Sequence, residues 1–217
     1  MTPPPLAVQF PDPRMNDTII NIGRQFGSGG RRIASALSYK LGIPVYDNEL
    51  IIEAAQKSGF SKELFKQRDE HKSVFTLTNF IGILNNYSGS ENYLNDNRLF
   101  KIQSDVILEL AQQGPAIFVG RASDYVLREM DCLDVFITAP LEVRKKDVAE
   151  REGISLEEAE SMIAKRDRDR ESYYNYLTFG QWGVASNYDL CIDSSILGID
   201  ATADFIIDFG RKCGLVK

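Results

Sequence analysis

Short apolar runs alternate along the chain with longer segments whose apolar residues recur every three or four positions. The runs predict five buried strands, at residues 18–22, 43–46, 116–119, 133–138 and 188–192. Between the strands the spacing is helical, as at Ile33, Leu37 and Leu41. Because strands that alternate with helices form parallel sheets, we expect an α/β fold whose parallel sheet is covered by helices on both faces.

Local signals mark where several helices should begin and end. Gly42 is a suitable stop for the first helix, and Asp47 can cap the helix that follows the second strand. Ser155 and Glu158 have the spacing of a capping box. Further helices are expected at residues 99–110 and 200–209.

Two segments stand apart from this alternation. Residues 1–17 are rich in proline and predict an extended N-terminal arm, so that the folded domain would comprise residues 18–217. Residues 85–97 are polar and rich in asparagine, which predicts a loop that is mobile without ligand.

Composition limits the classes of partner. The chain has 217 residues, 43% of them hydrophobic, which is enough for one domain with a buried core. Its net charge of -6 argues against nucleic acid as a partner, because nucleic-acid-binding domains usually carry a basic surface. No apolar run reaches the roughly 20 residues that cross a membrane, so no membrane association is expected. The three cysteines are far apart and suggest neither a disulfide framework nor a zinc site, which favours a reduced, cytoplasmic location.

The strongest chemical signal is the glycine-rich turn at residues 23–30, between the first strand and the first helix. Glycines let backbone N–H groups approach a phosphate closely, and a helix N-terminus adds a favourable partial charge. Arg24, Arg31 and Arg32 flank the turn, so phosphate is a sensible ligand. The alternative is a turn that only connects a strand to a helix.

The turn departs from the usual P-loop pattern G-x-x-x-x-G-K-[ST]. That pattern places a lysine on the β- and γ-phosphates and a hydroxyl on Mg²⁺. Here Gly30 occupies the lysine position and Arg31 the hydroxyl position. Arg31 or Arg24 would have to supply the missing positive charge.

Several segments together resemble the cytidylate kinase-like proteins, a divergent branch of the nucleoside monophosphate kinases. In chain order they are IGRQFGSGGRRIA (22–34), LGIPVYDNEL (41–50), FVGRASDY (118–125), RDRDR (166–170), YYNYLT (173–178), WG (182–183) and NYDL (187–190). The resemblance covers residues 18–212, and its specificity lies in the ordered set.

The resemblance implies a P-loop kinase fold with a five-stranded parallel sheet, an acceptor-side helical insert at about 48–97 and a lid at about 153–182. It also implies ATP and Mg²⁺ as cofactors and small-molecule nucleotides as substrates, with CMP or dCMP as acceptor. The donor phosphates would be cradled by Arg24, Gly27, Ser28, Gly29, Gly30, Arg31 and Arg32.

The same resemblance assigns residues to the acceptor and to catalysis. Asp47 would begin the region that meets the acceptor nucleotide, and Arg121 would contact the acceptor phosphate. Arg166, Asp167 and Arg170 would close from the lid over the phosphoryl group in transfer. These roles suit phosphoryl transfer, which needs positioning and positive charge more than covalent chemistry.

Each assignment has a plainer alternative. Residues 166–170 could form a solvated helix face, Arg121 could pair with Asp124, and Asp47 could only cap a helix. Tyr173, Tyr174 and Tyr176 could pack in the core or on the surface of a homodimer.

Three functions therefore remain open from the sequence. The first is a kinase acting on a nucleoside monophosphate or on another small phosphorylated acceptor. The second is a catalytically impaired nucleotide-binding or sensing protein. The missing lysine favours it, as does Val119, because cytidylate kinases carry an aspartate just before the Gly-Arg pair. The third is an oligomeric scaffold that uses the tyrosine-rich segment.

Overall fold

The structure is a computed structural model that describes residues 18–51 and 93–217. The proline-rich arm, most of the acceptor-side insert and the helical patterns expected within it lie outside the described residues.

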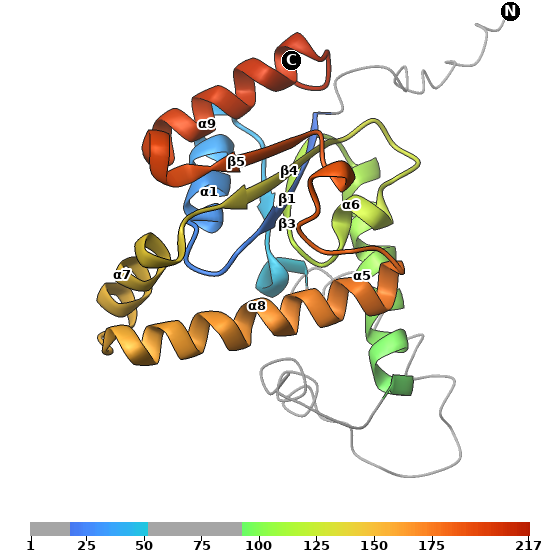
Figure 1. The fold of residues 1–217 in the computed structure, drawn as a ribbon. Helices are drawn as coiled ribbons and strands as arrows, with labels where there is room; N and C mark the ends of the chain where they lie inside the picture. Colours follow the sequence, from blue (N-terminus) through green and yellow to red (C-terminus); the bar gives the residue numbers. More distant parts are fainter. Residues whose placement is uncertain (1–17, 52–92) are drawn as a thin grey trace, which may run out of the picture.

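The described strands form one parallel sheet in the order β2-β3-β1-β4-β5 (Figure 1). Their bounds are Ile19–Arg24 for β1, Val45–Tyr46 for β2, Ala116–Val119 for β3, Leu133–Thr138 for β4 and Leu190–Asp193 for β5. Ile20 of β1 lies opposite Ile117 on one side and Leu133 on the other. The predicted five-stranded parallel sheet is confirmed, with β1 at its centre.

Helices follow the strands as the alternation predicts. They are α1 (Gly30–Leu41), α5 (Tyr93–Gln112), α6 (Ser123–Val126), α7 (Leu141–Glu152), α8 (Leu156–Thr178) and α9 (Ser194–Lys212), with a short 3₁₀ helix, η1, at Ala185–Asn187. None of the described helices is long and apolar enough to cross a membrane.

Some boundaries differ from the prediction. Helix α5 begins at Tyr93, within the stretch expected to be a loop, and α9 begins at Ser194 rather than near residue 200. The Asp193 side chain caps α9 by accepting from the Ser195 N–H at 2.9 Å, and Gly198 breaks its helical geometry with φ 76°. The charged run and the aromatic run merge into the single helix α8.

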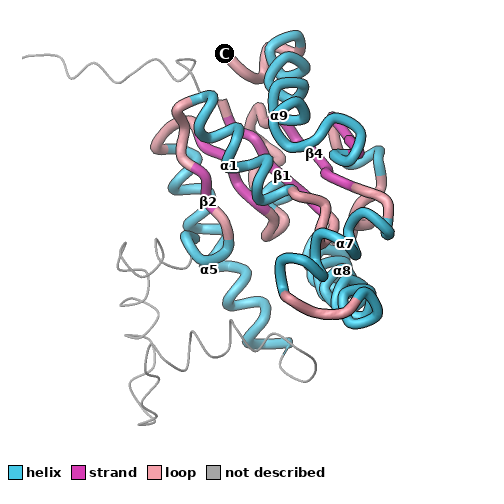
Figure 2. Tube along the Cα trace, turned by 90° about the vertical axis from the view of Figure 1, so that its left-hand side faces the viewer, coloured by secondary structure: helices cyan, strands magenta, loops and turns pink. Residues whose placement is uncertain are grey.

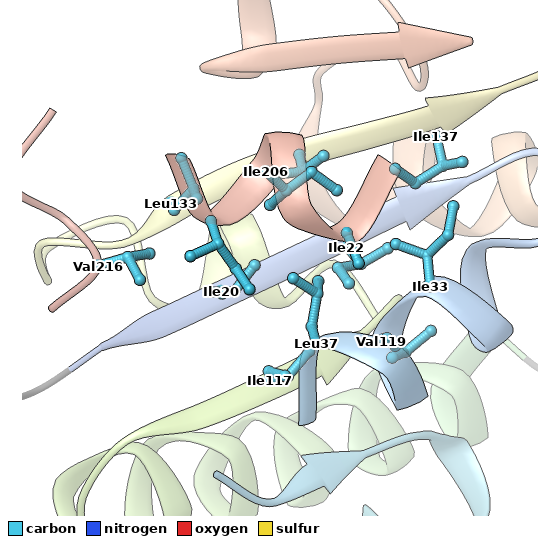
Figure 3. Packing of buried hydrophobic residues seen from close by; sticks show 14 residues of the cluster. Ile20, Ile22, Ile33, Leu37, Ile117, Val119, Leu133, Ile137, Ile206 and Val216 are labelled. Carbon is cyan, nitrogen blue, oxygen red and sulfur yellow. The ribbon is translucent and has the colours of Figure 1, made fainter. Parts of the chain in front are cut away.

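Strand β1 alternates strictly between the two faces of the sheet. Ile20 and Ile22 pack under α1 and α9, where Ile33, Leu37 and Ile206 complete a buried cluster (Figure 3). The other face holds a second cluster, which is formed with α5 and includes Ile19, Val106, Ile107, Phe118 and Leu127. Figure 2 shows the strands enclosed between these helices, so both faces of the sheet are covered, as expected.

Helix α8 is anchored at its start by the predicted capping box. The Ser155 Oγ accepts from the Glu158 N–H at 3.2 Å, and the Ser155 N–H donates to the Glu158 carboxylate at 2.9 Å. A short connection at residues 153–155 joins α8 to α7, against which it packs. From there α8 passes beneath the sheet (Figure 1), where it contacts the end of β1.

A partly buried carboxyl group lies between β1 and β4. The Asn21 amide donates to the Asp134 Oδ1 at 2.8 Å. Burial raises the pKa of Asp134 to about 6; the bond from Asn21 opposes this shift, and the carboxylates of Asp124 and Asp189 add to it. Compared with the unfolded chain, the folded state therefore favours the protonated form of the Asp134 carboxyl over the charged form.

Replacing Asp134 with Asn should stabilise the protein at pH 8 by on the order of 1–2 kcal/mol, since the group keeps some contact with solvent. The folded-state pKa lies above the ordinary value, so wild-type stability should fall as the pH rises from about 4 to about 6. The variant lacks this charge, and its advantage should vanish below about pH 4. Urea unfolding at several pH values would measure this, with Asp131→Asn, at an exposed site, as the control. An advantage of equal size at every pH would contradict the argument.

Candidate phosphate-binding site

The glycine-rich turn adopts a conformation that requires its glycines. Gly27 and Gly29 have φ values of 79° and 75°, in the left-handed region that favours glycine. A Cβ at Gly27 would also lie 2.9 Å from the Val148 Cγ2. Gly29 directly precedes α1, whose first N–H groups have no acceptor within the helix and are available to an anion.

The turn is held from β4 and α9. The Ser28 Oγ donates to the Gln25 carbonyl at 2.9 Å and to the Ile137 carbonyl at 3.1 Å. The Ser194 hydroxyl at the start of α9 donates to the Ser28 carbonyl at 2.6 Å. The buried Ser28 hydroxyl is thus engaged within the protein, and the shape of the turn is fixed before any ligand arrives.

A buried ion pair ties the turn to α7 and α8. Asp167 accepts from the Phe26 N–H at 2.7 Å through one oxygen and from the Arg144 guanidinium at 2.6 Å through the other. Arg144 also donates to the Phe26 carbonyl at 3.2 Å and to the Ala139 carbonyl at 3.0 Å. We call Arg144, Asp167 and the Phe26 backbone the clasp. Sequence reasoning missed Arg144, because a single arginine in a charged helix resembles a solvated side chain.

Arginines from separate elements gather at the end of β1. Arg24 ends this strand, and Arg170 of α8 donates to its carbonyl at 2.9 Å. Burial lowers the pKa of Arg24, and the charges of Arg170, Arg121 and Arg31 lower it further. Burial likewise lowers the pKa of Arg170 to about 10. These guanidinium groups repel one another, and an anion between them would relieve that repulsion.

Arg121 follows β3 in an unusual backbone conformation. Gly120, Arg121 and Ala122 have successive φ values of 74°, 62° and 51°. Left-handed conformations are uncommon for residues other than glycine and occur at functional sites. The Arg121 guanidinium lies 5.2 Å from the centre of the Tyr173 ring. Asp124, the partner considered for Arg121, accepts a hydrogen bond from the Tyr174 hydroxyl at 2.7 Å.

Asp47 lies at the end of β2, opposite the start of α1. Its carboxylate caps the next helical turn by accepting from the Glu49 and Leu50 N–H groups at 3.1 and 3.2 Å, so the predicted cap is confirmed. The other oxygen contacts Arg31 at 2.6 Å. The Asp47 charge also raises the pKa of Arg24, against the larger lowering effects.

The structure thus brings together part of the predicted set and leaves part outside. Arg31, Asp47, Arg121 and Arg170 all lie within electrostatic reach of Arg24, which ends β1 at the glycine-rich turn. By contrast, Arg32 turns towards Asp147 of α7, with which it forms an ion pair. Arg166 is exposed on α8, where its charge reaches Arg170.

No protein cluster prepared for a metal ion accompanies these arginines. Within residues 18–51 and 93–217, no group of three or more His, Cys, Asp or Glu side chains could hold one. Both Asp167 oxygens accept hydrogen bonds from protein groups. The described side chains therefore do not form a Mg²⁺ site of their own. Mg²⁺ commonly reaches such proteins bound to substrate phosphates and water.

Comparisons with known proteins agree with this geometry. The model of the cytidylate kinase-like family matches residues 19–196. The cytidylate kinase of Methanopyrus kandleri is 29% identical over 85% of this chain and 88% of its own. An uncharacterized protein from Eubacterium ventriosum ATCC 27560 superposes with a TM-score of 0.67 and 27% identity, over 88% of this chain and 96% of that one. The shikimate kinase of Acinetobacter baumannii shares the fold at 14% identity, with a TM-score of 0.50 over 90% of this chain and 93% of that one.

Proposed function

Because the chain belongs to the cytidylate kinase-like family, we propose that it transfers the γ-phosphoryl group of ATP to a nucleoside monophosphate, CMP or dCMP in the first instance. The observation that carries this proposal is the convergence of Arg24, Arg121 and Arg170 beside the glycine-rich turn. They come from the ends of two neighbouring strands and from α8. Ligands in open α/β sheets bind beyond the carboxyl ends of the strands.

The donor would bind at the turn and the start of α1. The N–H groups of residues 29–32 would receive the β- and γ-phosphates, and Arg31 would add a nearby positive charge. Mg²⁺ would enter with the nucleotide and supply charge neutralisation there. Because the turn is held by Ser194 and by the clasp, it needs no rearrangement to receive the phosphates.

The acceptor would bind between the ends of β2 and β3. Arg121 would contact its phosphate, and Asp47 would face the rest of the nucleotide once the ion pair with Arg31 opens. An oxygen of the acceptor phosphate then attacks the γ-phosphorus, the bond from the γ-phosphorus to the β–γ bridging oxygen breaks, and ADP leaves. The attacking oxygen of the acceptor phosphate is already ionised near neutral pH, so the reaction needs no protein base.

The remaining candidates would act on the group in transfer. Phosphoryl transfer spreads negative charge over the three equatorial oxygens of that group, and fixed arginines stabilise this charge. Arg170 is suited to this task because its hydrogen bond to the Arg24 carbonyl already holds its guanidinium group at the end of β1. Asp167 and Arg144 would orient α8 and the turn, while Arg166 would add charge from the exposed side.

A nucleotide sensor without turnover is the second candidate. Two observations favour it: Gly30 stands at the lysine position of the P-loop pattern, and the buried Val119 stands before the Gly-Arg pair. If the chain is instead a kinase for another small phosphorylated acceptor, the donor machinery is the same, and the difference lies in the group that Asp47 and Arg121 contact.

Thermal unfolding with ATP–Mg²⁺ and a panel of nucleoside monophosphates tests these alternatives. A ligand that binds only the folded state must raise the midpoint, by an amount set by its concentration relative to Kd. We expect a shift with ATP, a further shift with CMP or dCMP, and ADP release with the same acceptor. A shift without ADP release for any acceptor would support the sensor, and no shift with any nucleotide would refute both.

A further inference from the structure

Gly30, the first residue of α1, is a glycine for reasons of space rather than of backbone conformation. It is buried and is not among the glycines with positive φ. A Cβ built on Gly30 would lie 2.7 Å from the Cβ of Arg24 and 2.9 Å from its Cγ. The Cβ of Arg24 is fixed by the backbone of β1 and cannot move aside without moving the strand. The stem of Arg24 therefore fills the volume that a side chain at position 30 would need.

The other end of Arg24 reaches the end of the neighbouring strand. A Cβ on Gly120, directly after β3, would lie 1.7 Å from the Arg24 Nη1 and 2.8 Å from its Cζ. The guanidinium group thus lies against the Gly120 backbone, next to Arg121. The side chain spans from the start of α1, on the donor side, to the Gly-Arg pair on the acceptor side.

This contact links the glycine at the lysine position to a further departure from the P-loop pattern, at residue 24. With the lysine position at residue 30, counting back along G-x-x-x-x-G-K-[ST] places the first glycine of the pattern at residue 24. At the positions of residues 24 and 30 the usual pattern has glycine and lysine, whereas this chain has arginine and glycine. Each glycine leaves room for the long side chain at the other position.

Arg31, the other candidate for the missing charge, lies on the surface and pairs with two carboxylates in the ligand-free protein, so it is suited to an auxiliary role at the donor phosphates. Its side chain is 69% exposed and contacts Asp47 at 2.6 Å and Glu49 at 3.4 Å. Arg24 instead faces Arg121, Arg170 and Arg31 with Asp47 as the nearby carboxylate, so its position is electrostatically costly in the ligand-free protein. A phosphate group among these arginines would turn that cost into attraction.

We propose that Arg24 supplies, from the end of β1, the cation that P-loop kinases supply from the first turn of the following helix. Its guanidinium group contacts the phosphoryl group in transfer, between the donor cradle and Arg121. The inference deepens the proposed function and rests on it. It assigns Gly30 the role of making room for the stem of Arg24, while Gly120, whose φ of 74° itself favours glycine, lets the guanidinium group lie against its backbone.

The first test separates a binding role from a structural one. Arg24→Met keeps a long unbranched stem and removes the charge. We expect ATP–Mg²⁺ to bind about 10- to 100-fold more weakly by titration calorimetry, as for a lost hydrogen bond to a charged group. The midpoint of the ligand-free protein should stay the same or rise, because the variant removes charge repulsion. The exposed Arg211→Ala on α9 is the control and should bind as wild type.

The second test is a rescue. Arg24→Gly alone should lose ATP affinity to a similar extent, and the double variant Arg24→Gly/Gly30→Lys, which restores the usual pattern, should recover at least about tenfold. Glycine is required at position 24 of the double variant, because even an alanine Cβ there would collide with the Cβ of the lysine introduced at position 30.

The outcomes distinguish this inference from the function on which it rests. Wild-type affinity in Arg24→Met, or no recovery in the double variant, would overturn the role of Arg24 while the kinase proposal stands. Absence of ATP binding by the wild-type protein would overturn both. If Arg24→Met fails to fold, the comparison of Arg24→Gly with the double variant decides.

Discussion

Replacing Arg170 with Ala should lower turnover on the order of a thousandfold while weakening ATP binding less than about tenfold. Arg170 reaches the end of β1 from α8 and lies within electrostatic range of Arg24 and Arg121. Its charge should therefore matter most when negative charge builds up on the group in transfer. The measurements are kcat with the acceptor identified by thermal shift, and ATP affinity by calorimetry.

Two further variants make this result specific. Arg168→Ala removes an exposed arginine from the same helix and should leave both quantities unchanged. Arg170→Lys keeps the charge but loses the planar fork, so it should recover only part of the turnover. Equal losses of turnover and of ATP affinity in Arg170→Ala would instead indicate a binding role only.

Replacing Arg144 with Met should reduce the free energy of unfolding by about 3–5 kcal/mol, the usual cost of removing one partner of a buried ion pair. The Arg144 and Asp167 side chains are only 10% and 18% exposed, so a charge left without its partner would be poorly solvated. The change also leaves the Phe26 and Ala139 carbonyls without this donor. Urea unfolding measures the loss.

The control for the clasp lies about two turns further along the same helix, α7. Arg151→Met on α7 keeps a long stem near the Phe26 ring, which the Arg151 guanidinium faces at 5.2 Å, and breaks the exposed ion pairs with Asp147 and Glu152. It should cost about 1 kcal/mol, because exposed ion pairs and an exposed cation–π contact each contribute little. A double variant, Arg144→Met/Asp167→Leu, should recover only part of the single loss: it removes the carboxylate that Arg144 no longer pairs, but it also takes that carboxylate from Arg170, which lies 3.9 Å from it. If Arg144→Met were as mild as the control, the clasp would not be what holds the turn.

Sequence reasoning worked best where one local signal decides the structure. Strands β3 and β4 begin and end at the expected residues, because apolar runs there are bounded by turn signals. The start of α5 was mispredicted, since asparagine favours turns whereas Asn95 and Asn97 lie within the first turns of this helix. The start of α9 was missed because Gly198 interrupts the helical pattern just after the Asp193 cap.

The candidate site divides in the same way. The glycines of the turn and the Asp47 cap could be picked out from spacing and residue type, whereas Arg121 was picked out by the resemblance of residues 118–125 to the family. The partners of Asp167 could not, because Arg144 and Phe26 meet it only once α7 and α8 fold back onto the turn. Nor does any spacing rule indicate that the stem of Arg24 excludes a side chain at residue 30; that contact exists only between the folded strand and helix.

This mutual exclusion restricts how one version of the loop can evolve into the other. A chain with lysine at residue 30 has no room for arginine at residue 24, and a chain with Arg24 has no room for a lysine at residue 30. Single substitutions can connect the two only through an intermediate with glycine at both positions, which carries neither cation. The two versions are thus separated by a fitness valley, and a lineage that has crossed it is expected to keep arginine and glycine together.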